Sequence, residues 1–342
     1  MKMFLFFLVG LYATQSLAQF PLPKVYDCLQ IDQSISIDGQ ATESAWKTAK
    51  WSDHFVDIEG EKNNTPYYTT AFKMLWDTNN LYLFALLEEE HLWATLKNHD
   101  DIIYRDNDFE VFIDPDSDNH NYLEIEVNLF NTILDLMLTK PYRNGGPLIM
   151  DWTANGLQSK ITMAGTLNDP SDTDSLWRIE MAIPIKIISE IPRVGESWRI
   201  NFSRVQYETM IIAEQYNKKK DLYGKILPEN NWVWSPQGII NMHYPEKWGY
   251  LFFNDSAGSK TAKQPEDAAI RMALHELYYE QSVYLKKNGI PNKDMINEIT
   301  VANELYKIDL VIQEKDFEIS AANTKWTWHI QNDSKIWKSR NQ

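Results

Sequence analysis

The chain has 342 residues, of which 44% are apolar, and its formal net charge at pH 7 is −15. A chain of this size and composition can bury a large hydrophobic core, or two smaller ones. The negative charge argues against binding to nucleic acid or to anionic membrane surfaces, because phosphate groups would repel the protein. The single cysteine, Cys28, cannot form an internal disulfide, so packing has to stabilise the fold.

The N-terminus has the pattern of a secretory signal peptide. Met1 and Lys2 precede an apolar run from Met3 to Tyr12, and Ser16-Leu17-Ala18 supplies a small-residue end. The run is too short to span a bilayer, which takes about 20 apolar residues. We therefore expect residues 1–18 to be removed and the protein to be exported to the periplasm or the extracellular space.

Residues 25–253 have the pattern of short strands separated by turns. The clearest alternation runs from Tyr122 to Leu129, with Leu123 and Ile125 on one face and Glu124 and Glu126 on the other. Regular strands without long intervening helices predict a mainly β fold, an antiparallel two-sheet β-sandwich. The other strands are expected at Thr70–Trp76, Leu81–Leu87, Asp108–Asp114, Thr132–Leu138, Leu176–Ile183, Trp198–Val205 and Trp248–Phe253.

The character of the sequence changes after residue 253. Residues 254–264 have the composition of a linker, and Pro265-Glu266-Asp267 is typical of a helix start. We expect an α-helical extension over residues 265–342, with one helix ending near Lys287 and a second over residues 293–308. Short strands are expected near residues 317–321 and 326–330. The helices of this extension are a candidate surface for a partner protein.

Five phrases in the first part of the chain together resemble the family 9 carbohydrate-binding modules and the wider group of DOMON-like sandwiches. The resemblance covers about residues 25–253 and implies non-catalytic binding of an oligo- or polysaccharide, with structural calcium and no organic cofactor. It rests on Ile37-Asp38-Gly39 with Glu43-Ser44-Ala45-Trp46, Leu75-Trp76-Asp77 with Leu81-Tyr82, residues 106–115, residues 122–128, and residues 198–204.

The resemblance implies that an aromatic residue before the acidic strand, Tyr104, forms one wall of a sugar site. The segment that contains Trp232 and Trp234, or His243 after it, supplies the other wall, and the sequence leaves open which side chain does so. The residues near Tyr104 suit a sugar independently of the resemblance, because aromatic faces stack on sugar rings and polar groups bind hydroxyls. These neighbours are Trp93, which is equally consistent with a core position, Arg105 and Asn107.

The loop after the acidic strand is a candidate calcium site. Asp114, Asp116 and Asp118 place carboxylates at alternating positions of a tight turn, and Glu124 or Asp77 is a candidate fourth ligand. Carboxylate oxygens are the ligands that Ca²⁺ prefers. An Asp-rich hairpin turn without a metal is the alternative interpretation.

Two other functions are consistent with parts of the sequence. Glu124 and Glu126 share a strand face about 7 Å apart, a spacing that an inverting glycoside hydrolase would accept. We expect them instead to form an ordinary solvated surface. A haem-binding DOMON domain for electron transfer would need axial Met and His ligands, for which Met74, Met137 and His243 are the candidates. Methionines at strand spacing are more often core residues.

Overall fold

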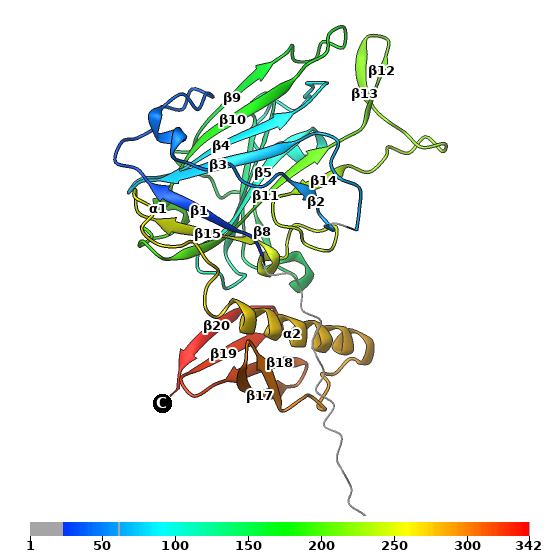
Figure 1. Cartoon of the computed structure of the whole chain (residues 1–342). Helices are drawn as coiled ribbons and strands as arrows, with labels where there is room; N and C mark the ends of the chain where they lie inside the picture. Colours follow the sequence, from blue (N-terminus) through cyan, green and yellow to red (C-terminus); the bar gives the residue numbers. More distant parts are fainter. Residues whose placement is uncertain (1–22, 61, 342) are drawn as a thin grey trace, which may run out of the picture.

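The computed structural model describes residues 23–60 and 62–341. The signal peptide expected at residues 1–18 lies outside these ranges. Thirteen strands between Val25 and Asn254 form one large curled β-sheet (Figure 1). Its strands are β1 (Val25–Gln30), β2 (Val56–Asp57), β3 (Thr70–Trp76), β4 (Asn80–Glu88), β5 (Asp108–Asp114), β6 (Tyr122–Asn128), β7 (Ile133–Leu138), β8 (Leu148–Ile149), β9 (Gln158–Ala164), β10 (Leu176–Pro184), β11 (Ser197–Gln206), β14 (Asn230–Val233) and β15 (Gly249–Asn254).

The expected two-sheet antiparallel sandwich is therefore wrong in its topology, although the mainly β class is confirmed. The strands follow the order β8-β7-β6-β5-β11-β15-β1-β3-β4-β10-β9 in one hydrogen-bonded sheet. The sheet is mixed, because β1 pairs in parallel with both β15 and β3. β11 connects the half of the sheet that contains β5 to the half that contains β15. It pairs with β5 along most of its length and with β15 through its first part, and its last part also pairs with β14.

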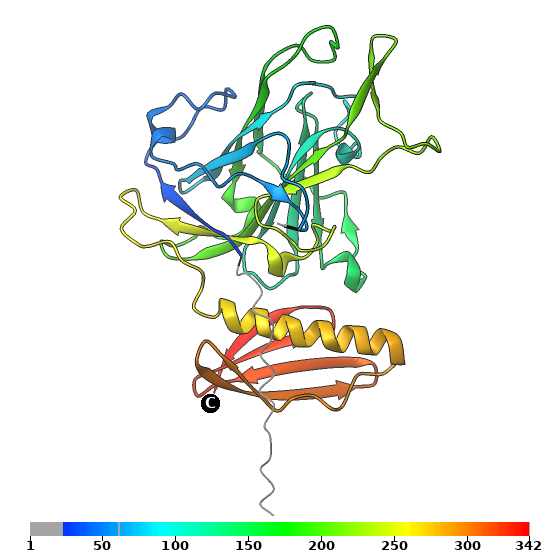
Figure 2. The same cartoon turned by 45° about the vertical axis from the view of Figure 1, so that its right-hand side comes forward.

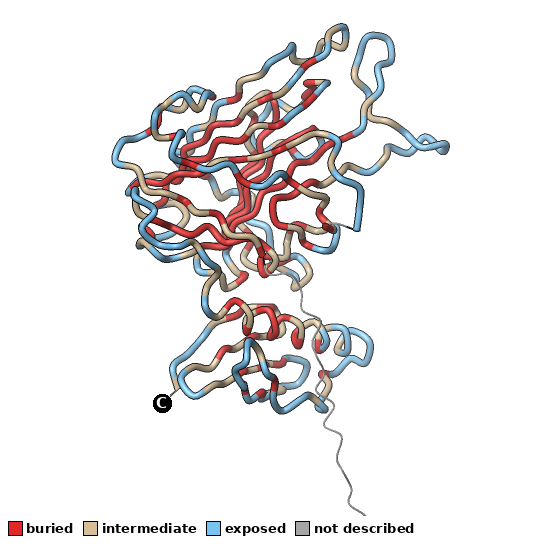
Figure 3. The backbone as a smooth tube through the Cα atoms, in the orientation of Figure 1, coloured by how far each residue is buried: buried red, intermediate tan, exposed pale blue. Residues whose placement is uncertain are grey.

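The main hydrophobic core fills the space inside the curled sheet, and buried residues concentrate on the central strands of that sheet (Figure 3). On β5, the side chains of Phe109, Val111 and Ile113 belong to this core, as the alternation predicts. Phe112 belongs to a second apolar cluster, which therefore lies on the opposite face of the same strand. Both faces of this half of the sheet are thus covered, and β5 and β6 are buried along their whole length.

Short elements connect the strands. The hairpin β12 (Thr209–Ile212) and β13 (Gln215–Lys218) projects away from the large sheet (Figure 1). The remaining connections contain η1 (Ser44–Lys47), η2 (Ile103–Arg105), η3 (Tyr142–Asn144), α1 (Ile185–Ile188) and η4 (Pro245–Lys247). No helix in the described part of the chain is long and apolar enough to cross a membrane.

The C-terminal region contains one long helix and a five-stranded antiparallel sheet (Figure 2). The helix expected at residues 293–308 is wrong, since strands occupy most of that range. Ala302 and Asn303 both have positive φ angles, of 50° and 66°, as a two-residue hairpin turn requires. The elements are α2 (Ala268–Asn288), β16 (Glu298–Val301), β17 (Glu304–Gln313), β18 (Asp316–Ala322), β19 (Trp326–Gln331) and β20 (Ile336–Arg340).

α2 lies on the side of the small sheet that faces the large unit (Figure 2). Loops of the large unit bond directly to this C-terminal region. Asn119 donates to the carbonyl oxygen of Ser334 at 3.0 Å, and Arg271 donates to that of Ser117 at 3.1 Å. Tyr278 donates to Asn144 Oδ1 at 2.9 Å. The C-terminal region thus docks on the β-sheet unit of its own chain.

Candidate functional site

A cavity of about 410 Å³ opens on the face of β5, β6 and β11 that points away from the main core. Its size falls within the range of about 300–1,000 Å³ typical of small-molecule sites. Aromatic, acidic and amide side chains surround it. The lining residues are Ile102, Tyr104, Glu110, Phe112, Glu124, Glu126, Leu134, Leu136, Tyr142, Leu148, Met150, Val205, Glu229, Asn231, Asn241, Met242 and His243.

The floor of the cavity is acidic because glutamates alternate with core residues along β5 and β6. Glu110 stands opposite Glu126 in the antiparallel register, and Glu124 stands opposite Phe112. All three glutamates are buried. The solvated surface expected for Glu124 and Glu126 is therefore wrong, since residues 241–243 and η3 help to cover this face.

Burial changes the protonation of these carboxyl groups. Desolvation first, and also the nearby charge of Glu229, raise the pKa of Glu110 to about 7. Desolvation and the charge of Glu110 raise the pKa of Glu124 to about 8. The floor therefore holds carboxyl groups that can donate as well as accept hydrogen bonds near neutral pH.

Two tyrosine rings stand at the cavity and remain accessible. Tyr104 and Tyr142 are each 44% exposed, in contrast to the buried floor. Tyr104 lies on η2, and its backbone N–H donates to Glu126 Oε2 at 2.9 Å, which fixes its position. Tyr142 lies on η3, and its ring centroid is 4.4 Å from that of His243. An exposed aromatic face beside buried carboxyl groups suits a ligand with both apolar and hydroxyl-bearing surfaces.

Two hydrogen bonds and one buried ion pair fix His243 in the wall. Tyr122 Oη lies 3.0 Å from His243 Nδ1, and Arg143 donates to the His243 carbonyl oxygen at 2.8 Å. Arg143 also makes two bonds to Glu246, at 2.9 and 3.0 Å. Burial first, and then the charge of Arg143, lowers the pKa of His243 to about 3. His243 is therefore a neutral imidazole at physiological pH.

The second buried histidine, His275 on α2, makes stability depend on pH. Burial lowers its pKa from 6.5 to about 3; Glu246 opposes this effect, whereas Arg143, Arg199 and Lys247 add to it. The folded state binds this proton less readily than the unfolded chain. Its contribution to stability is therefore full above pH 6.5 and is lost as the pH falls toward 3. Between pH 6.5 and pH 5, we expect His275 alone to account for a loss of about 2 kcal/mol.

Urea unfolding at both pH values of wild type, His275→Gln and His54→Gln tests this expectation. His54 is exposed and serves as the matched control. His275→Gln should reduce the acid-side loss, while the part due to His243 remains, and His54→Gln should leave the loss unchanged. An identical pH slope in all three proteins would show that His275 carries no such linkage.

The structure places the predicted wall residues in different environments. Tyr104 and His243 both line the cavity. Trp232 and Trp234 are each 2% exposed and belong to the main core, where the Trp234 ring packs 5.3 Å from that of Phe72. These two rings do not line the cavity. The segment after them contributes through Asn241, Met242 and His243 instead.

The other predicted sugar-binding residues lie outside the cavity lining. Trp93 is buried against Tyr207, with ring centroids 6.4 Å apart, which corresponds to the core alternative. The Asn107 side chain donates to Glu89 Oε2 at 3.2 Å and accepts from the Tyr207 N–H at 2.8 Å, so it links the residues that directly follow β4 and β11. Arg105 is exposed, and its backbone carbonyl oxygen accepts a bond from Lys218.

Sequence reasoning missed Glu110, Tyr142 and Asn241 as cavity residues. Glu110 carried a usable signal, because it alternates with core residues on β5 and so has to share a face with Glu124 and Glu126 across the strand pair. Tyr142 and Asn241 lie in loops, and no pattern in the sequence indicates that these loops meet over the same strands.

The proposed calcium loop brings three of its four residues together. Ligand atoms of Asp114, Asp116 and Asp118 all lie within 4.8 Å of one another. Asp114 accepts the N–H groups of Ser117 and Asn119, both at 2.9 Å. Burial, and then the charges of Asp116 and Asp118, raises the pKa of Asp114 well above its usual value. Glu124 does not join this loop, because it lines the cavity.

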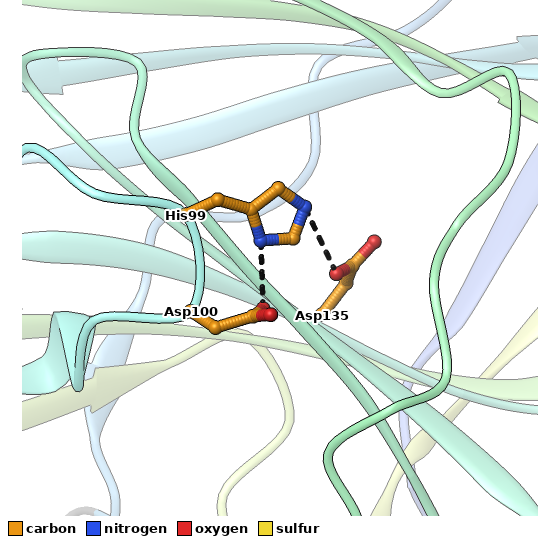
Figure 4. Close-up of side chains that lie close together, drawn as sticks. All are labelled: His99, Asp100 and Asp135. Atoms are coloured by element: carbon orange, nitrogen blue, oxygen red, sulfur yellow. Dashed lines mark ion pairs between the residues drawn. The ribbon is translucent and has the colours of Figure 1, made fainter.

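A histidine and two aspartates form another group, at the edge of the sheet (Figure 4). His99 Nδ1 lies 2.7 Å from Asp100 Oδ1, and His99 Nε2 lies 3.6 Å from Asp135 Oδ1. Asp135 alternates on β7 with Leu134 and Leu136, which line the cavity, so it points to the other face. The polar stretch around His99 therefore holds a loop against β7 and is not part of the cavity.

The haem alternative has no support in this arrangement. Met74 is part of the main core inside the curl, whereas His243 stands in the cavity wall on the other face of the β5–β6 half of the sheet. Met137 lies on β7, two residues from Asp135 and on the same strand face. The candidate axial ligands therefore do not converge on a shared space.

Comparisons with known proteins agree with the fold. A curated relative from Arthroderma benhamiae, named an extracellular protein, is 26% identical over 146 residues, which cover 41% of this chain and 64% of the relative. A solved structure from Bacteroides uniformis, described as a candidate carbohydrate-binding protein, is 16% identical, with a TM-score of 0.50. That match covers 68% of this chain and all of the other.

A family 9 carbohydrate-binding module from Caldicellulosiruptor kristjanssonii, solved with cellotriose, is 17% identical with a TM-score of 0.45. It matches over 71% of this chain and its own full length. A family model described as carbohydrate family 9 binding domain-like matches residues 37–210, just over half of the chain. The chain therefore belongs to the carbohydrate family 9 binding domain-like family.

Proposed function

We propose that the chain binds an oligo- or polysaccharide without cleaving it, and that the cavity on β5, β6 and β11 is the binding site. The observation that supports this most directly is the pair of exposed tyrosines, Tyr104 and Tyr142, beside a buried polar floor. A sugar ring has an apolar face that stacks on an aromatic ring and a rim of hydroxyls that hydrogen-bond to carboxyl and amide groups. Family membership supports the same proposal.

Export to the periplasm or the extracellular space accompanies this proposal. The pattern of residues 1–18 supports it, and the curated relative bears the name of an extracellular protein. Polysaccharides are abundant ligands in these compartments, which fits a binding protein that acts outside the cytoplasm.

Removal of one aromatic wall should weaken sugar binding. We expect Tyr104→Ala to lower the affinity for a retained glycan about 2- to 12-fold, because stacking contributes about 0.5–1.5 kcal/mol. Tyr142→Ala should have a similar effect. The matched control is Trp51→Ala, since Trp51 is equally exposed but packs against Phe84 on the other half of the sheet.

Isothermal titration of the three variants with the same glycan makes this comparison. Circular dichroism confirms that each variant is folded before it is titrated. An affinity of Tyr104→Ala and Tyr142→Ala equal to that of wild type would place sugar binding elsewhere on the chain.

The protonation of the cavity floor is also consistent with a second candidate function, glycoside hydrolysis. A carboxyl group whose pKa is raised to about 8, as for Glu124, is protonated at neutral pH and can act as a general acid. Release of new reducing ends from a bound glycan by wild type, lost in Glu124→Gln, would establish the hydrolase. Binding without such release supports the non-catalytic function.

Calcium in the loop after β5 is also part of this proposal. The donor set of Asp114, Asp116 and Asp118 consists of carboxylate oxygens, as Ca²⁺ requires. Lys335 Nζ lies 3.3 Å from Asp118 Oδ2, so this loop carries one cationic partner from the C-terminal unit. A bound ion there would stabilise the loop that joins the two units and would stand apart from the sugar.

A further inference from the structure

A second cavity, of about 370 Å³, opens beyond the ends of β4 and β11. It is distinct from the first cavity, the one on β5, β6 and β11. Gln206 lines it and alternates with the core residue Phe202, whereas Val205 points to the other face and lines the first cavity. The second cavity is thus the mouth of the curled sheet, and the mouths of β-barrels are common ligand sites. Its lining residues are Tyr67, Tyr68, Glu89, His91, Gln206, Tyr207, Glu208, Thr209 and Lys219.

Two neighbouring tyrosines form an aromatic corner in this mouth. The Tyr67 ring is 53% exposed, and its centroid lies 4.7 Å from those of Tyr68 and Trp232, at interplanar angles of 71° and 88°. The Arg204 guanidinium lies 5.5 Å from the centroid of the Tyr68 ring. Both tyrosines are therefore held in place, although Tyr67 is open to solvent. Rings fixed in this way lose little conformational freedom when a ligand stacks on them.

Arg204 also fixes two polar groups at the bottom of the mouth. It donates to Glu89 Oε2 at 3.0 Å and twice to Gln206 Oε1, at 3.0 and 2.8 Å. Glu89 is 2% exposed and Gln206 is 3% exposed, yet both line the cavity. Polar side chains held by a buried partner are arranged in advance for hydrogen bonds to a ligand.

The charges in this lining are balanced, in contrast to the acidic floor of the first cavity. Glu89 pairs with Arg204, and Glu208 pairs with Lys219 at 2.9 Å. Among the described lining residues, each carboxylate and ammonium group thus already has a partner of opposite charge, and none is left for an ionic ligand. Accessible aromatic rings beside amide and hydroxyl groups suit a neutral ligand that is rich in hydroxyls, as a saccharide is.

We propose that the mouth of the curled sheet is a second saccharide site, in which a sugar ring stacks on Tyr67, so that one chain binds a glycan at two places. The choice of a saccharide rests on the proposed function; the cavity and its fixed rings do not. Tyr207 links the two sites, because it lines the mouth and its Oη donates to the carbonyl oxygen of Tyr104 at 3.1 Å. Two linked sites bind a long polysaccharide more tightly than either site alone.

Uptake of a short oligosaccharide by the full chain tests the number of sites. The probe is the shortest oligosaccharide that a glycan array shows to bind, and wild type should take up two equivalents per chain at saturation in equilibrium dialysis. Isothermal titration of the double variant Tyr104→Ala/Tyr142→Ala then isolates the second site, since both substitutions lie in the first cavity.

In that background, Tyr67→Ala should weaken the remaining binding about 2- to 12-fold, because one stacked ring is lost. Tyr67→Phe keeps the ring and should keep the affinity. Tyr284→Ala is the matched control, since Tyr284 is 37% exposed but lies on α2, and it should change nothing. Circular dichroism confirms that each variant is folded.

The outcomes separate this inference from the proposed function. Uptake of one equivalent, weakened by Tyr104→Ala but not by Tyr67→Ala, would overturn the second site and retain the first. Uptake weakened by Tyr67→Ala but not by Tyr104→Ala would retain the site in the mouth and reject the first cavity. A folded wild-type protein that takes up no glycan would reject both.

Discussion

Replacement of Arg143 by alanine should destabilise the folded protein by about 3–5 kcal/mol, because it would leave Glu246 buried without its partner. The Glu246 carboxylate has no exposed surface, and the Arg143 side chain is 16% exposed. Burial alone would raise the pKa of Glu246, but the charge of Arg143 and the hydrogen bond from Tyr279 hold it at about 2. The buried Glu246 carboxylate is therefore stabilised by the Arg143 guanidinium, which donates to both of its oxygens.

The same substitution should weaken sugar binding. Arg143 follows Tyr142 in the chain and bonds to the carbonyl oxygen of His243, so one side chain links two parts of the cavity wall. Its guanidinium also stacks on the Tyr244 ring at 4.2 Å, and Tyr279 of α2 donates to Glu246. The C-terminal unit thereby supports the cavity from behind.

Chemical unfolding of Arg143→Ala, Arg143→Lys and Lys219→Ala measures the effect. Lys219 pairs with Glu208 at 2.9 Å, but both side chains are well exposed, so its loss should cost less than about 1 kcal/mol. Arg143→Lys should be intermediate, since lysine keeps the charge but not the paired bonds. A stability of Arg143→Ala within 1 kcal/mol of wild type would contradict the account of this ion pair.

Arg204→Met should have an effect of similar size, about 3–5 kcal/mol, at the other buried ion pair. Arg204 and Glu89 lie 3.0 Å apart, and both are almost completely buried. Arg204 also donates to the side chains of Gln206 and Thr70 and to the Glu88 carbonyl oxygen. Methionine would fill similar space, but it would remove the arginine donor from each of these acceptors, and Glu89 would keep only its bond from Asn107 on that oxygen.

Two companion variants separate charge from packing. Glu89→Gln should cost less than Arg204→Met, because the arginine, although it stays charged, keeps its hydrogen bonds to Gln206, Thr70 and Glu88. Arg193→Met is the surface control, since Arg193 is 87% exposed and its contact with Glu196 is 3.9 Å. Equal unfolding free energies for Arg204→Met and Arg193→Met would show that the buried network contributes nothing measurable.

The strands themselves could be predicted from the sequence because their period of two is a local property. Residues 108–114 and 122–128 form strands as expected, with Val111 and Ile125 in the core. The topology could not be predicted, since it depends on partners distant in the chain. β1 pairs with β15 more than 200 residues later, through Val25 and Tyr250, and this parallel pairing joins what alternation suggested were two sheets.

The burial of the cavity floor also depended on distant residues. Alternation correctly placed Glu124 and Glu126 away from the core, but it could not show that residues 241–243 cover them. The helix expected at residues 293–308 failed for a local reason. Apolar residues at helical spacing also fit the alternation of β17, and the turn at Ala302-Asn303 fixes the hairpin instead.

The candidate site was predicted in part. Tyr104 and His243 line one cavity, whereas Trp232 and Trp234 pack inside the curl, where large rings fill the space between the two halves of the sheet. The rings of Trp232 and Trp234 thus belong to the core of this fold and not to the cavity lining. The tyrosines at the cavity are distinguished by exposure, which no sequence pattern reveals.

A glycan array probed with the full chain in the presence of calcium tests the central claim most directly. We predict retention on at least one oligo- or polysaccharide by wild type and by Trp51→Ala, and weaker retention by Tyr104→Ala. A folded wild-type protein that binds no glycan on a broad array would contradict carbohydrate binding. Retention unchanged by Tyr104→Ala and Tyr142→Ala would contradict its location in the cavity on β5, β6 and β11.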